Sequence, residues 1–188
     1  MPKQDHKYLN TLGKRLGLTA HVSVLDRKVH TLFCNYPSNT ATNVEDWLLD
    51  VSNNRGARVV QRDNPPDESF IPPSKSEFSN EDLIVAICLT QRLDRPQLLR
   101  LAAQFITRGD IDVQYLVRLA RRERAEIILG EMAKQALKVD CNHQAWRRIY
   151  EEFPSKKKIC SPVIHWQRLA WPVMTSKGYN AEKWRLVG

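Results

Sequence analysis

The sequence predicts a mainly α-helical protein of the α+β class. Apolar residues recur at helical spacing throughout residues 79–153. Apolar and more polar residues alternate over residues 20–36, which is the period of a β-strand. Four prolines interrupt residues 63–78, which indicates a linker or an extended crossing segment between the two regions.

These observations divide the chain into four parts. We expect a small α-β-β-α-β module at residues 1–62 that packs on a bundle of four or five helices at residues 79–153. A Pro-rich linker at 63–78 joins them, and a basic, Trp-containing tail occupies residues 154–188. A chain of 188 residues is long enough to bury such a core without disulfide bonds.

The N-terminal module starts with a helix predicted from Asp5 to Leu16. A β-hairpin follows, with its turn at Asp26–Lys28. Its strands carry the alternating residues Val22, Val24, Val29, Thr31 and Phe33. Asn43 then caps a second predicted helix that runs to Asp50 or Val51. Residues 57–61 are predicted to form the third strand.

The bundle starts with a predicted capping box, in which the side chains of Ser79 and Asp82 bond to each other's backbone N–H groups. The helix that follows, Asn80 to Thr90, is apolar on every side, as expected of a buried helix. A second helix is predicted after Asp94. It ends at Gly109.

A third helical stretch is capped by Asp110 or Asp112. Its apolar stripe is interrupted near Glu123 and Arg124, which predicts two helices, at residues 112–122 and 124–138. Asn142 or His143 caps the last helix, and Pro154 ends it. Its apolar face carries Trp146, Ile149, Tyr150 and Phe153.

The charge of the chain is concentrated near its C-terminus. The net charge is +8, and residues 134–188 hold 11 of the Lys and Arg residues against 4 acidic ones. Tryptophans and a tyrosine lie among these cations. Cations neutralise phosphates and aromatic rings stack on unpaired bases, so the pattern predicts a nucleic-acid-binding protein, or a subunit of a nucleic-acid-binding complex. The predicted contact residues are Arg147, Arg148, Lys156, Lys157, Lys158, Trp166, Arg168, Trp171, Lys177, Lys183, Trp184 and Arg185.

A protein–protein adaptor is the alternative prediction. In that case the helical domain would hold a partner, with the tail tryptophans as interface anchors. A DNA-reading helix-turn-helix at residues 95–122 is a weaker alternative, with Gln114, Arg118 and Arg121 toward the groove, because an ordinary helical hairpin explains the pattern better. The arginines near Glu123 and Glu126 are expected to be partly paired, for example Arg122 with Glu126.

A zinc site is the weakest of the binding hypotheses. Its ligands would be Cys141, His143, Cys160 and His165, whose spacing matches no familiar zinc motif. No short motif for hydrolysis or nucleotide binding is present, so we expect no cofactor and favour a non-catalytic role. The four cysteines form no CxxC pair, and there is no apolar run of membrane-spanning length, so we expect a cytoplasmic protein with free thiols.

Overall fold

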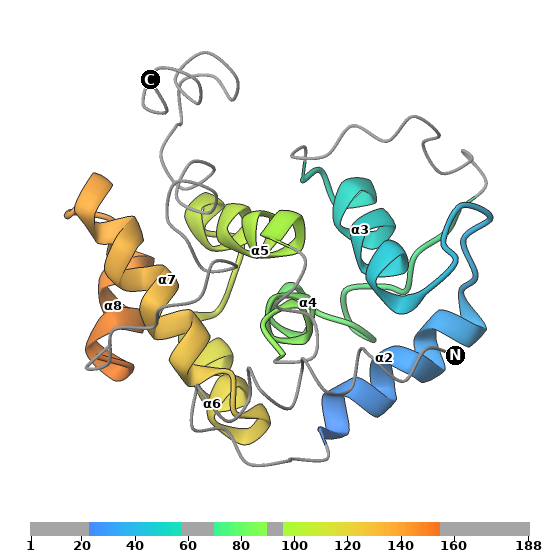
Figure 1. Ribbon diagram of the computed structural model, residues 1–188, viewed down its shortest axis with the longest axis horizontal. Coiled ribbons are helices and arrows are strands. Elements are labelled where there is room, and N and C mark those ends of the chain that lie inside the picture. The colour runs from blue at the N-terminus through green and yellow to red at the C-terminus, as the bar shows by residue number, and fades with distance from the viewer. Residues whose placement is uncertain (1–22, 58–69, 90–95, 155–188) are drawn as a thin grey trace, which may run out of the picture.

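A computed structural model describes residues 23–57, 70–89 and 96–154, and these residues form seven α-helices and no strand (Figure 1). The helices are α2 (Val24–Asn35), α3 (Val44–Asn54), α4 (Asn80–Ile87), α5 (Pro96–Arg108), α6 (Val113–Glu123), α7 (Glu126–Val139) and α8 (Gln144–Glu152). The prediction of an α-β-β-α-β module is therefore wrong, and the described part of the chain is all helical.

The predicted hairpin is in fact helix α2. Its buried residues Leu25, Val29 and Leu32 recur at helical spacing, and this apolar stripe outweighs the strand-like alternation of the neighbouring valines. Ser23 begins the helix by accepting a hydrogen bond from the backbone N–H of Asp26. Asp26, which we assigned to a turn, thus lies in the first turn of the helix.

Helix α3 confirms the predicted cap, because the Asn43 side chain accepts a hydrogen bond from the backbone N–H of Asp46. Ala57, the first residue of the predicted third strand, follows the helix without regular structure. Residues 58–61 and the predicted helix at Asp5–Leu16 lie outside the described residues.

The described part of the proline-rich segment packs against α3. Phe78 is fully buried against Trp47, with ring centroids 5.9 Å apart. Arg55 stacks over the Phe78 ring and donates hydrogen bonds to the backbone carbonyls of Pro73 and Phe78. These contacts hold the segment in place as it enters α4.

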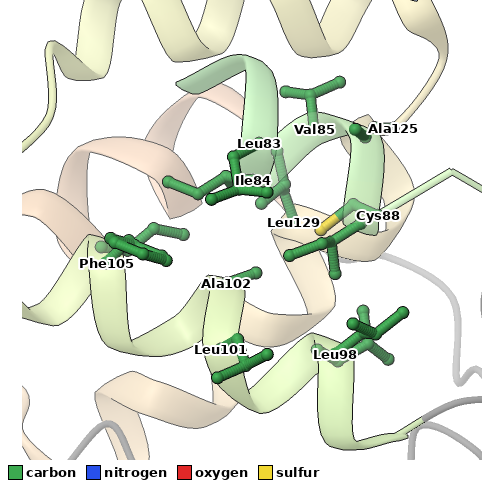
Figure 2. Packing of buried hydrophobic residues seen from close by; sticks show 14 of the residues in the cluster. Leu83, Ile84, Val85, Cys88, Leu98, Leu101, Ala102, Phe105, Ala125 and Leu129 are labelled. Atoms are coloured by element: carbon green, nitrogen blue, oxygen red, sulfur yellow. The ribbon is translucent and has the colours of Figure 1, made fainter. Parts of the chain in front are cut away.

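Helix α4 is the centre of the fold (Figure 1), and it packs against α2, α3, α5 and α6. The predicted capping box of Ser79 and Asp82 is present, and every residue of the helix is buried. Figure 2 shows Leu83 and Ile84 gathered with side chains from α5 and α7, including Phe105 and Leu129. An apolar helix of this kind is stable because neighbours cover it on all sides.

The polar first turn of α4 also fixes neighbouring segments. Lys28 of α2 forms a 2.8 Å ion pair with Asp82. Glu81 accepts a hydrogen bond from the backbone N–H of Asp112, and Asn80 donates one to the carbonyl of Asp110. The connection from α5 to α6 is therefore held to the start of α4.

The remaining helices follow the predicted pattern. Gly109 ends α5 in the left-handed region, at φ 78°, and Asp112 caps α6. The predicted interruption is a break at Arg124, whose φ is 59°, between α6 and α7. Helices α7 and α8 then form a closely packed pair. Gly130 of α7 permits this approach, because a Cβ built there would collide with the carbonyl oxygen of Phe153.

Candidate nucleic-acid interface

Helix α8 carries the two predicted contact residues that the structure describes. His143 caps the helix. On the predicted apolar face, Trp146, Ile149 and Phe153 are buried and Tyr150 is half-buried. The Trp146 indole donates a 3.1 Å hydrogen bond to the hydroxyl of Thr107 at the end of α5. With its apolar side fixed in this way, α8 leaves Arg147 and Arg148 exposed.

The two arginines have different environments. Arg147 donates to the backbone carbonyl of Cys141 at 2.9 Å, so its guanidinium is tied to the loop before α8. Arg148 has no hydrogen-bond or ion-pair partner among the described residues, and its side chain borders a cavity. Of the two, Arg148 is the more available to an anionic ligand.

Helix α6 lies beside α8 and adds further arginines. Arg121 pairs with Glu152 of α8 and stacks over the Phe153 ring, 5.4 Å from its centroid. Arg118, one turn earlier, stacks over the Tyr115 ring at 5.9 Å. Stacking on a ring limits the motion of a guanidinium and so lowers the entropy lost when it binds an anion.

These residues form one surface. Arg148 and Glu152 are four residues apart on α8, and Arg118 and Arg121 are three apart on α6, so each pair lies on one face of its helix. The Arg121–Glu152 ion pair joins the two faces. We call Arg118, Arg121 and Arg148, with Glu152 among them, the α6–α8 basic face.

Arg122, the remaining arginine of α6, is paired, as expected, but with a different partner. Arg122 donates to Glu123 at 2.9 Å, rather than pairing with Glu126 four residues on. Glu123 is buried and also accepts hydrogen bonds from Ser23 and from the backbone N–H of Leu25. Burial opposes ionisation of Glu123, but these donors outweigh it and lower its pKa.

The remaining predicted contact residues lie outside the described residues. They are Lys156, Lys157, Lys158, Trp166, Arg168, Trp171, Lys177, Lys183, Trp184 and Arg185. The last described residues are Phe153 and Pro154. Phe153 lies next to the α6–α8 basic face, because the Arg121 guanidinium stacks over its ring. In the sequence, the lysine triplet begins four residues after Glu152.

The arrangement of α5 and α6 does not support the helix-turn-helix alternative. Each of these helices packs mainly against α4 rather than against the other, so they also differ from the ordinary hairpin that we expected. Gln114 and Arg118 are exposed, but Arg121 is held by Glu152. A recognition helix requires a partner helix that braces it across the turn.

Of the four predicted zinc ligands, Cys141 and His143 lie among the described residues, and the His143 ring already makes hydrogen bonds within the protein. The Nε2 atom of His143 lies 3.0 Å from the carbonyl oxygen of Thr107, so it carries the proton, and Nδ1 accepts from the backbone N–H of Trp146. Both ring nitrogens are therefore in use. Within residues 23–57, 70–89 and 96–154 no three potential metal ligands come together, while Cys160 and His165 lie outside these ranges.

A cavity of about 420 Å³ opens beside Arg148. Residues from the end of α5, the connection to α6 and the first turn of α8 line it, among them Thr107, Gly109 and His143. A Cβ added to Gly109 would meet no atom within 4 Å, so the cavity is open there. No local sequence pattern indicates this cavity, because the residues on its two sides are 30 or more positions apart in the chain.

Comparisons with protein-family models, curated proteins and solved structures find no match to this chain. Among the described helices, none has both the length and the apolar composition needed to cross a membrane.

Proposed function

We propose that this protein binds nucleic acid without catalysis, alone or as a subunit of a complex, through the α6–α8 basic face and the basic residues that follow it. The observation that carries the proposal is the position of Arg148, Arg118 and Arg121 on adjoining faces of two packed helices. Arg118 and Arg148 can contact phosphates of one strand, and Arg121 can join them when it exchanges Glu152 for a phosphate.

The chain that follows this face supports the same proposal. Residues 155–188 contain seven Lys or Arg residues against one acidic residue, with three tryptophans. Cations and aromatic side chains together are typical of surfaces that track a strand and stack on its bases. A cytoplasmic location belongs to this proposal, since Cys34, Cys88 and Cys141 are free thiols and disulfides are rare in that compartment.

The described residues give the adaptor alternative no comparable support. Their exposed large hydrophobic side chains are Val24 in α2, Ile71 in the segment before α4 and Val139 at the end of α7. These come from separate parts of the fold and do not form one apolar patch that would receive a partner.

Fluorescence anisotropy with a labelled oligonucleotide and the full chain tests the proposal. We expect binding at low salt that weakens linearly on a plot of log K against log salt. Arg148→Ala should reduce that slope by about 0.7 on a single strand, and neutralising Lys156, Lys157 and Lys158 together should reduce it by about 2.

Arg27→Ala is the matched control, because Arg27 is exposed on α2, on the side of the molecule opposite α8 (Figure 1). It should leave the affinity and the salt slope nearly unchanged. If neither single-stranded nor duplex probes bind at low salt, the proposal is wrong. If Arg27→Ala weakens binding as much as Arg148→Ala, the surface has been misplaced.

A further inference from the structure

The cavity beside Arg148 has two chemically different sides. Ile111, Val113 and Ala145 contribute apolar surface, and Gln144 and His143 contribute polar groups. Arg148 lines it as well and is a cation without an ion-pair partner among the described residues. The cavity volume of about 420 Å³ lies within the range of small-ligand sites.

This combination suits one nucleotide of a strand. A nucleobase has apolar faces and a polar edge, so it matches a cavity with apolar walls and an exposed amide such as that of Gln144. The phosphate attached to that nucleotide would lie at Arg148, at the boundary between the cavity and the α6–α8 basic face. Duplex bases are stacked and paired, and only an unpaired base can enter a cavity of this kind.

We infer that the cavity accepts one unpaired base of a nucleic-acid strand, with Arg148 holding the adjacent phosphate, so the protein prefers single-stranded to duplex nucleic acid. The inference rests on the proposed function and narrows its ligand class. The walls of the cavity are held in place by separate contacts. The 110–112 connection is hydrogen-bonded to Asn80 and Glu81 of α4, and α8 is hydrogen-bonded to Thr107.

The test compares three probes with equal numbers of phosphates: a short oligothymidine, the same backbone with abasic sites, and a duplex. Burial of a base against apolar walls is worth about tenfold in affinity, so the oligothymidine should bind about tenfold tighter than the abasic strand. It should also bind more tightly than the duplex. Equal affinity for all three probes would show that only phosphates are recognised and would overturn the inference.

A variant that fills the cavity distinguishes the affinity contributed by the cavity from the affinity contributed by base stacking on the tail tryptophans. Ala145→Phe should lower the affinity for oligothymidine by about tenfold, because the base loses its apolar contacts, and leave that for the abasic strand unchanged. Ala145→Ser keeps the cavity open and serves as the control. Val113→Phe fills the cavity from α6, so it provides the same test if Ala145→Phe fails to fold.

Each remaining outcome has a distinct meaning. If Ala145→Phe and Val113→Phe both bind oligothymidine normally, the base lies elsewhere and the inference is wrong while the proposed function stands. If no probe binds at low salt, the proposed function itself fails. A free thymidine monophosphate that binds as tightly as the oligothymidine would identify the ligand as a nucleotide rather than a strand, and would also overturn the inference.

Discussion

The hydroxyl of Ser23 donates a 2.7 Å hydrogen bond to the buried carboxylate of Glu123, which lies 100 residues further along the chain. The same hydroxyl accepts a hydrogen bond from the backbone N–H of Asp26 and so caps α2. Glu123 occupies the last position of α6. One residue therefore begins the first described helix and ties it to the end of α6, next to the helix break at Arg124.

We predict that Glu123 makes the fold sensitive to acid. Its hydrogen bonds lower its pKa from the usual 4.5, so its carboxylate stabilises the folded state at pH values above about 4.5. This stabilisation is lost as the pH falls through the lowered folded pKa. Glu123→Gln should reduce the free energy of unfolding at neutral pH by roughly 1–3 kcal/mol and should flatten its decline in acid.

Urea unfolding followed by circular dichroism over a series of pH values measures both effects. Glu151→Gln is the control, because Glu151 is exposed on α8, and it should leave the pH profile nearly unchanged. An unaltered acid profile in Glu123→Gln would show that other carboxylates are responsible.

Two N-cap serines allow a direct comparison. Ser79→Ala removes a cap from α4 and should reduce the free energy of unfolding by about 1 kcal/mol. Ser23→Ala removes a cap from α2 and also deprives a buried carboxylate of a donor, so we expect a larger loss, about 2 kcal/mol.

A double-mutant cycle with Ser23→Ala and Glu123→Gln tests the cause of this difference. The two changes should be coupled by at least about 0.5 kcal/mol, whereas Ser79→Ala with Glu123→Gln should be additive. Additivity in the first cycle would mean that Ser23 acts only as a cap.

The contact between Gly130 and Phe153 predicts an unusual response to alanine. Alanine normally stabilises a helix relative to glycine, by about 0.5–1 kcal/mol. In α7 the added Cβ would collide with the backbone carbonyl of Phe153, so Gly130→Ala should instead destabilise the protein, by about 1–3 kcal/mol. Thermal unfolding measures the change. Lys138→Ala, at an exposed position on the same helix, should be nearly neutral, and a rise in melting temperature for Gly130→Ala would contradict the observed packing.

The Arg121–Glu152 ion pair predicts a variant with stronger binding. Glu152→Gln removes the acidic group from the α6–α8 basic face and frees Arg121 for a phosphate. Because exposed ion pairs are worth up to about 1 kcal/mol, the affinity for a single strand at low salt should rise by up to about fivefold.

Anisotropy titrations of Glu152→Gln and Glu151→Gln distinguish this specific effect from the general loss of a negative charge. Both variants change the net charge equally, but Glu151 has no ion-pair partner among the described residues. Equal gains in affinity would show that the net charge alone matters. The stability of both should stay within about 0.5 kcal/mol of the original protein.

Most of the described helices begin at a capping residue that can be recognised in the sequence. Ser79 with Asp82, Asn43, Asp112 and His143 each marked a helix start that the structure confirms. The same kind of signal, Ser23 with Asp26, is present at the start of α2, where the alternation of valines indicates a strand instead. The prediction placed Val24 and Val29 on the two strands of a hairpin, whereas Leu25, Val29 and Leu32 form the buried stripe of one continuous helix.

The sequence by itself determined where most of the described helices begin and end, because caps, glycine stops and apolar stripes act over only a few residues. It also determined that cations follow α8. Only the tertiary structure decided that Ser23 meets Glu123, that Thr107 meets both His143 and Trp146, and that Gly130 lies against Phe153. These contacts depend on how the helices pack around α4, and packing joins residues whose separation along the chain leaves no local pattern.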